Sequence, residues 1–162
     1  MTNLFCKTAS AALMSLGLMA LSACETSSVA LGEPVTGDFL TGDSLEQFLS
    51  GKYLFVPGSQ MGFFYSPDGK TLSISSDPLA GVGEWTMNDG AFCSREDYYY
   101  RDGGALMEAR NGDCFILAIQ EDGSHIMYSM LSGQTAALPL GSIVEGFPRM
   151  TEYLRLVDEL DL

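Results

Sequence analysis

The fold is decided by the stretch from Glu84 to Leu131, which reads EWTMNDGAFCSREDYYYRDGGALMEARNGDCFILAIQEDGSHIMYSML. Asp89-Gly90 and Asp122-Gly123 each separate two short apolar or alternating runs. An Asp-Gly pair in that setting predicts a β-hairpin, because the central residues of the favoured tight turn need positive φ. The stretch therefore predicts two hairpins, with Cys93 in the first and Cys114 in the second.

The rest of the chain continues this pattern of short strands and close turns. We expect strands at 53–56, 61–65, 71–76 and 134–140, with a Pro-Asp-Gly turn at 66–70 and a loop at 77–83. In the 71–76 run Leu72 and Ile74 alternate with hydroxyl side chains, which predicts a strand with one face in water. The fold class is mainly β, an antiparallel meander curled into a small barrel or half-barrel. A flat two-sheet sandwich is the alternative.

Two helices are expected beside the sheet. Residues 43–49 form a short amphipathic segment with Asp43 as its expected cap, and Gly51 ends it. Residues 149–162 form a C-terminal amphipathic segment with apolar residues at helical spacing, expected to pack on the barrel. The domain organisation is then a signal peptide at 1–23, a flexible linker at 24–42, a β domain at 43–148 and this last segment.

The N-terminal segment indicates export. An apolar run from Ala9 to Leu21 follows Lys7 and is too short to span a bilayer, as in a signal peptide. Its end, Leu21-Ser22-Ala23-Cys24, resembles the bacterial lipobox. The resemblance implies that Cys24 carries acyl chains, including palmitate-like ones, and anchors the protein in a membrane. Because Glu25 and not Asp follows Cys24, it also implies the periplasmic face of the outer membrane.

The net charge limits the class of partner that we expect, and the cysteine content predicts a cross-link. The formal net charge of −13 disfavours nucleic acid, whose phosphates would be repelled. With Cys6 in the signal peptide and Cys24 lipidated, Cys93 and Cys114 remain as a pair, and a pair in an oxidising compartment predicts a disulfide. A metal site is the alternative, although two thiols with one distant histidine lack a fourth ligand. No cofactor is expected.

The order of motifs in the mature chain resembles a family of small exported bacterial β proteins of unknown function. The resemblance is carried by Phe63 to Gly69, Gly83-Glu84-Trp85, the two cysteines and Asp122-Gly123. It covers about residues 45–148 and implies a Pro-Asp-Gly hairpin, a Gly-x-Trp strand and paired cysteines. It implies no catalytic residues.

Groups for catalysis are sparse. His125 is the only histidine, and Ser124 beside it would point to the opposite face of a strand, so the two cannot act as base and nucleophile. Most Asp residues neighbour a glycine, where turn geometry accounts for them. We therefore expect a protein that is not an enzyme.

Recognition is expected in the segment that follows Cys93. Tyr98, Tyr99 and Tyr100 lead into a long insert from Arg101 to Asp113, and three consecutive tyrosines cannot all point inward. With Arg101 and Arg110 they form the predicted binding site for an envelope protein, a glycan or a small ligand, anionic ones included. The expected function is a membrane-anchored envelope lipoprotein with a binding or accessory role. A structural component without a small ligand is the alternative, and a hydrolase is the least supported.

Overall fold

The computed structural model describes residues 37–57 and 60–162 and is mainly β. The expected signal peptide, Cys24 and most of the expected linker lie outside these residues. The strands are β1 (Asp38–Leu40), β2 (Lys52–Val56), β3 (Met61–Tyr65), β4 (Lys70–Ile74), β5 (Leu79–Asn88), β6 (Ala91–Asp102), β7 (Ala105–Ile119), β8 (His125–Ser129), β9 (Thr135–Leu138) and β10 (Ile143–Glu145). The helices are α1 (Gly42–Leu49) and α2 (Met150–Leu160).

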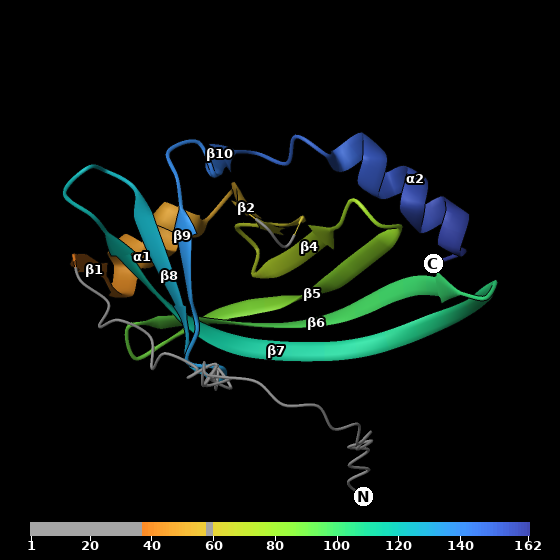
Figure 1. Ribbon diagram of the computed structural model, residues 1–162, viewed down its shortest axis with the longest axis horizontal. Helices are drawn as coiled ribbons and strands as arrows, with labels where there is room; N and C mark the ends of the chain where they lie inside the picture. The colour runs from red at the N-terminus through yellow and green to blue at the C-terminus, as the bar shows by residue number, and fades with distance from the viewer. Residues whose placement is uncertain (1–36, 58–59) are drawn as a thin grey trace, which may run out of the picture.

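All ten strands belong to one antiparallel sheet that curls into a nearly closed barrel (Figure 1). Its hydrogen-bonded order is β10-β2-β3-β4-β5-β6-β7-β8-β9, and β1 pairs with the end of β7. The order from β2 to β9 follows the chain, so the predicted meander and barrel are confirmed. Strand β10 was not predicted, and it joins the sheet beside β2 through the pair Glu145 and Lys52.

The backbone φ angles at the two Asp-Gly turns can be compared with those that the sequence predicts. Asp89 and Gly90 have φ values of 43° and 85°, as a two-residue hairpin turn requires. The corner at Asp122-Gly123 differs from the expectation, because only Gly123 has positive φ and the connection is longer, closed by a Gln120 N–H bond to the Ser124 carbonyl of 2.8 Å.

The segment expected to be a long insert belongs to a regular hairpin. Strands β6 and β7 pair continuously from Phe92 opposite Phe115 to Asp102 opposite Ala105. Gly103 and Gly104, with φ of 56° and 87°, make the tight turn between them. The prediction of an insert from Arg101 to Asp113 is therefore wrong, because these residues continue the two paired strands and the turn between them.

Two further boundaries were also predicted wrongly. Strand β1 lies within the segment assigned to the linker, and its residue Leu40 pairs with Leu117 of β7. Strand β5 begins at Leu79, within the segment expected to be a loop. Helix α1 is capped by Thr41 rather than Asp43, through a reciprocal pair of bonds with Ser44.

The first hydrophobic cluster fills one end of the barrel interior. Leu45 and Leu49 of α1 are fully buried there against residues of the sheet such as Leu54 and Leu117. Phe92 and Tyr65 meet edge to face with ring centroids 5.4 Å apart. Helix α1 therefore plugs this end of the barrel.

The second cluster lies on the outside of the sheet, beneath α2. Tyr153, Leu156 and Leu160 of the helix are buried against outward-facing side chains that include Ile74 and Ala80. The expected C-terminal amphipathic helix is therefore confirmed. Its buried face includes Leu156, whereas Leu154 is exposed. Helices α1 and α2 thus lie at opposite ends of the elongated sheet (Figure 1).

Because α2 covers the outside of β4, the side chains that point outward and those that point into the barrel are the opposite of what the sequence predicted. The apolar residue Ile74 points outward under the helix, whereas Thr71 and Ser73 point into the barrel and are fully buried. The prediction that the hydroxyl face of this strand is in water is therefore wrong. The alternation was identified correctly, but the polar side chains line the interior.

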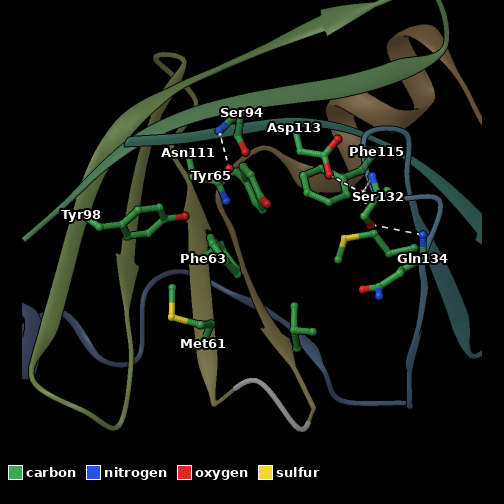
Figure 2. A pocket seen from close by; sticks show the side chains of 14 residues that line it. Met61, Phe63, Tyr65, Ser94, Tyr98, Asn111, Asp113, Phe115, Ser132 and Gln134 are labelled. Atoms are coloured by element: carbon green, nitrogen blue, oxygen red, sulfur yellow. Dashed lines mark hydrogen bonds between the residues drawn. The ribbon is translucent and has the colours of Figure 1, made fainter. Parts of the chain in front are cut away.

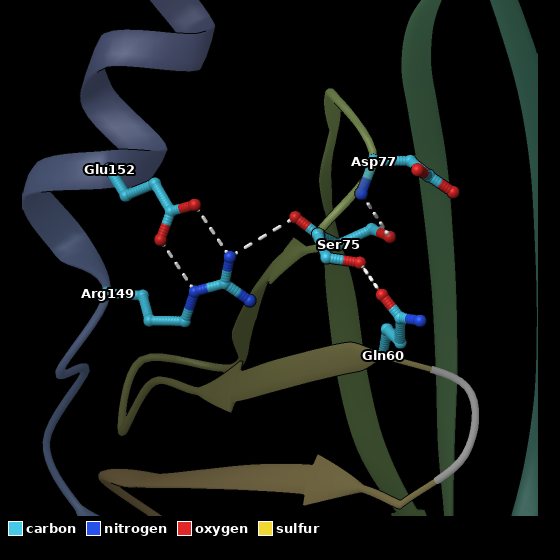
Figure 3. A network of polar contacts seen from close by, with 6 residues as sticks. Gln60, Ser75, Asp77, Arg149 and Glu152 are labelled. Carbon is cyan, nitrogen blue, oxygen red and sulfur yellow. Dashed lines mark hydrogen bonds and ion pairs between the residues drawn. The ribbon is translucent and has the colours of Figure 1, made fainter.

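A polar network fixes the start of α2 to the β4–β5 turn (Figure 3). Arg149 donates to both carboxylate oxygens of Glu152, each at 2.7 Å, and to the Ser75 carbonyl at 3.2 Å. Within the turn, the Asp77 N–H donates to the Ser75 hydroxyl, and the Ser76 hydroxyl donates to Gln60, which directly precedes β3. The helix is thereby tied to the sheet by polar contacts at its first turn and by apolar contacts along its length.

Candidate functional site

The barrel interior is hollow at the end that α1 does not fill. A cavity of about 400 Å³ lies between β2–β3 on one side, β6–β7 on another, and the β8–β9 hairpin (Figure 2). This volume is within the range of small-molecule sites. The lining residues are Val56, Met61, Phe63, Tyr65, Ser94, Tyr98, Asn111, Gly112, Asp113, Phe115, Met127, Ser129, Ser132 and Gln134.

The lining is divided into an apolar wall and a polar wall. Met61 and Phe63 of β3 form the apolar wall, with Met127 of β8 completing it. Ser94, Asn111 and Asp113 of β6 and β7 form the polar wall, with side-chain oxygen or nitrogen atoms in the lining. A ligand with one apolar and one polar side would satisfy both walls, and the flexible methionines suit an irregular shape.

Asp113 has a defined position at the mouth of the cavity. Its Oδ1 accepts the backbone N–H of Cys114 at 2.7 Å and that of Leu131 at 3.0 Å. Its Oδ2 accepts the hydroxyl of Ser129. The carboxylate therefore holds the β8–β9 turn against β7 and is held rigidly itself. Among the described residues no ion pair neutralises it.

A buried carboxyl group lies behind the polar wall. Glu96 of β6 is 1% exposed, and its Oε2 accepts the Ser73 hydroxyl at 2.7 Å. Its Oε1 has no partner of hydrogen-bonding geometry in the described chain, nor has the buried hydroxyl of Thr71. These groups form a polar layer in the interior next to Tyr98.

Two glycines of β5 make room for this layer. A Cβ at Gly81 would stand 2.0 Å from the Ser73 hydroxyl oxygen and 2.8 Å from the Tyr98 ring. A Cβ at Gly83 would stand 2.8 Å from both the Cα and the Cγ of Glu96. Only glycine at these two positions allows the side chains of β4 and β6 to meet across β5.

Burial raises the pKa of the titratable groups in this polar layer and beside it. Desolvation raises the pKa of Glu96, and the hydrogen bond from Ser73 opposes part of that rise. Burial, with the nearby Glu96, also raises the pKa of Tyr98 and that of Tyr65. Both phenols lining the cavity are therefore neutral hydrogen-bonding groups in the physiological range.

The five residues predicted to bind a partner are divided between the two faces of the sheet. Tyr98 lines the cavity, and strand alternation places Tyr100 on the same face. Tyr99 lies on the opposite face and packs against the cluster beneath α2. Arg101 and Arg110 also lie on that outer face. The structure therefore brings only Tyr98 to the cavity, with Tyr100 beyond it on the hairpin.

Both arginines have carboxylate partners outside the barrel. Arg110 Nη2 donates to Asp97 at 3.0 Å, with a second bond from Nε. Arg101 donates to the Glu159 carbonyl at 3.2 Å and lies 3.5 Å from Asp161, at the C-terminal end of α2. Arg101 thereby joins the tip of the β6–β7 hairpin to α2.

The disulfide forms as predicted. Cys93 and Cys114 are directly opposite each other on β6 and β7 and are bonded, with Cα atoms 4.0 Å apart. The next pair along the ladder, Ser94 and Asp113, belongs to the polar wall of the cavity. The cross-link therefore fixes the register of the strands that carry this wall.

His125 and Ser124 are not arranged as a catalytic pair. The imidazole packs against Phe48 in a tilted arrangement with ring centroids 4.9 Å apart, and burial lowers the pKa of His125. The Ser124 hydroxyl donates to Asp122 at 2.6 Å. In the described chain no group of three or more His, Cys, Asp and Glu side chains is placed to hold a metal ion. Neither α1 nor α2 is long and apolar enough to cross a membrane.

Comparison with known proteins gives no relative on which to base a function. No family model, curated protein or solved structure matches the chain.

Sequence reasoning missed most of the cavity lining. Asn111 and Asp113 were part of the supposed insert, although their i, i+2 spacing with Phe115 indicates one face of a strand. The opposing wall from β3 is about fifty residues earlier in the chain than Asn111 and Asp113. Only the closure of the barrel brings the two walls together.

Proposed function

We propose that this protein is a lipid-anchored envelope lipoprotein that binds a small molecule in the open end of its barrel, without catalysis. The cavity of about 400 Å³ with one apolar and one polar wall is the observation that carries the proposal. Barrels of this size are either filled by side chains or retain space for one small ligand. Here α1 fills one end, and the other end retains the space.

Binding can be tested with a neutral fluorescent probe, N-phenyl-1-naphthylamine, whose emission rises in an apolar site. Ser94 lies in the polar wall, so Ser94→Phe should fill the cavity and abolish the rise. Thr86→Phe is the matched control, because it adds the same ring at an exposed position of the neighbouring strand β5. Equal probe binding by wild type and both variants, each folded by circular dichroism, would remove the support for a cavity ligand.

Anchorage is proposed from the Leu21-Ser22-Ala23-Cys24 sequence. Cys24→Ser should leave export intact and move the protein from the membrane fraction to the soluble periplasmic fraction. Mass spectrometry of the wild-type N-terminal peptide should show acyl chains, and density-gradient separation should place it with the outer membrane. A Cys24→Ser protein that still sediments with membranes would contradict the anchor.

A structural role without a ligand is the second candidate, favoured by an exposed apolar corner. Met130 and Leu131 in the β8–β9 turn are 53% and 75% exposed and lie beside the disulfide. Such a corner suits attachment to another envelope protein. Loss of crosslinking to a defined envelope partner in Leu131→Asp, with probe binding unchanged, would assign attachment to this corner.

A further inference from the structure

The charges around the cavity limit the ligands that it can accept. Its lining contains one carboxylate, Asp113, and no lysine, arginine or histidine. Glu96 lies directly behind the wall and bonds to Ser73 rather than to a cation. The whole chain carries a formal net charge of −13. An anionic group would enter this site against repulsion and would meet no basic partner.

The basic side chains nearest in sequence face the other way. Arg95 and Arg110, with Lys70, line a separate hollow on the outer face of the sheet. There Lys70 pairs with Glu84 at 2.7 Å and Arg110 pairs with Asp97. The sheet itself therefore separates these cations from the cavity, which stays acidic.

Aromatic side chains supply the second half of the recognition chemistry. Phe63, Tyr65, Tyr98 and Phe115 all belong to the lining. The faces of such rings attract cations, and aromatic surfaces combined with a carboxylate are suited to amines and quaternary ammonium groups. Figure 2 shows Tyr98 and Tyr65 pointing into the same space as Asp113, above Met61 and Phe63.

We infer that the cavity binds an amphipathic organic cation, a protonated amine or quaternary ammonium group joined to a compact apolar group. The cationic group lies against Asp113 and the neighbouring aromatic rings. The apolar group lies on the wall formed by Met61, Phe63 and Met127. This inference rests on the proposed function, because it specifies the ligand of the same site.

Three probes of equal size separate the charge from the shape of the ligand. They are 4-phenylbutylamine, 4-phenylbutanol and 4-phenylbutyrate, which are cationic, neutral and anionic near neutral pH. Trp85 reports binding, because its ring centroid is 5.8 Å from that of Tyr65 in the cavity wall. We expect the amine to bind about tenfold more tightly than the alcohol, and the carboxylate more weakly than the alcohol.

Matched variants test the role of the carboxylate. Asp113→Asn keeps the oxygen that accepts the backbone N–H groups of Cys114 and Leu131 and removes the charge. It should reduce the advantage of the amine over the alcohol about fivefold. Asp102→Asn, which removes one charge at an exposed position of the same hairpin, should leave that advantage unchanged.

Salt provides a measurement on the unmodified protein. Raising NaCl from about 50 to about 500 mM should weaken binding of the amine and leave binding of the alcohol unchanged, since ions screen charge but not apolar contact. Binding of the alcohol and the carboxylate as tightly as the amine would overturn the inference and leave the proposed function intact. No binding of any of the three would count against both.

Discussion

The packing of α2 on the outer face of the barrel yields a quantitative prediction with an internal control. Leu156 and Leu154 are two residues apart on the same helix, and their side chains are 3% and 57% exposed. Leu156→Ala and Leu154→Ala make the same chemical change and the same small change in helix propensity. Any difference in stability between the two variants therefore measures burial against the sheet.

The magnitude follows from the methylene and methyl groups that each variant removes from a buried site. A leucine-to-alanine change deletes three carbons, which contribute roughly 0.8 kcal/mol each when buried, and the cavity left behind adds to the loss. We expect Leu156→Ala to lower the free energy of unfolding by about 3 kcal/mol. For Leu154→Ala, whose side chain is mostly in water, we expect about 1 kcal/mol or less.

Urea unfolding, followed by Trp85 fluorescence and far-ultraviolet circular dichroism, measures both values. Trp85 belongs to the interior cluster, on the other side of the sheet from Leu156. A loss seen equally by the two probes shows that α2 stabilises the whole barrel rather than only itself. Equal losses of free energy in the two variants would contradict this role of α2, as would a fluorescence transition of Leu156→Ala that matches that of wild type.

Three further predictions concern the interior and the cross-link. Replacing both Cys93 and Cys114 by Ala should lower the free energy of unfolding by about 3 kcal/mol in the chain-entropy model, given their separation of 21 residues, and urea unfolding under oxidising conditions measures this. Burial raises the pKa of Glu96, so the folded state holds its proton more tightly. The resulting stabilisation is complete below the ordinary pKa of 4.5 and is lost as the pH rises through the folded pKa. Glu96→Gln should therefore flatten the fall in stability that wild type shows above about pH 4.5, and an unchanged pH profile would contradict it. Gly81→Ala should cost about 1–3 kcal/mol by overpacking, and Ser73→Ala in the same chain should recover part of that loss, which thermal unfolding of the single and double variants can decide.

The meander could be predicted from sequence because its signals are local. Strand β3 has the expected bounds, and the Asp89-Gly90 turn has the expected backbone. Each depends on residues within a few positions of one another, where period and turn chemistry are informative. The pairing of Cys93 with Cys114 depended on counting and compartment, and the register of β6 and β7 agrees with it.

The errors arose where tertiary structure decides which face of a strand is buried. Thr71 and Ser73 look like a solvent face, but α2 covers the opposite side of β4 and the barrel encloses them with Glu96. A helix about eighty residues later in the chain gives no local signal on β4. Residues 101–113 were interpreted as an insert, although Gly103-Gly104 is also a dipeptide typical of a two-residue hairpin turn.

The candidate site was predictable only in part for the same reason. Strand alternation is enough to separate Tyr98 from Tyr99, and it was used only to infer that one tyrosine would be exposed. It could not show that Tyr98 faces Met61 and Phe63, since that contact requires the sheet to curl. A cavity formed by residues from five strands has no contiguous motif.

The pairing of β10 with β2 has a consequence for the order in which the strands pair during folding. Every neighbouring pair from β2 to β9 is joined by a short connection, so these hairpins can form early and independently. The pairing of Glu145 with Lys52 instead joins residues 93 positions apart, and closing a loop of that length in an unstructured chain costs about 4 kcal/mol. Prior formation of the meander shortens the loop and lowers this cost. We therefore expect β10 to pair with β2 only after the hairpins between them have formed.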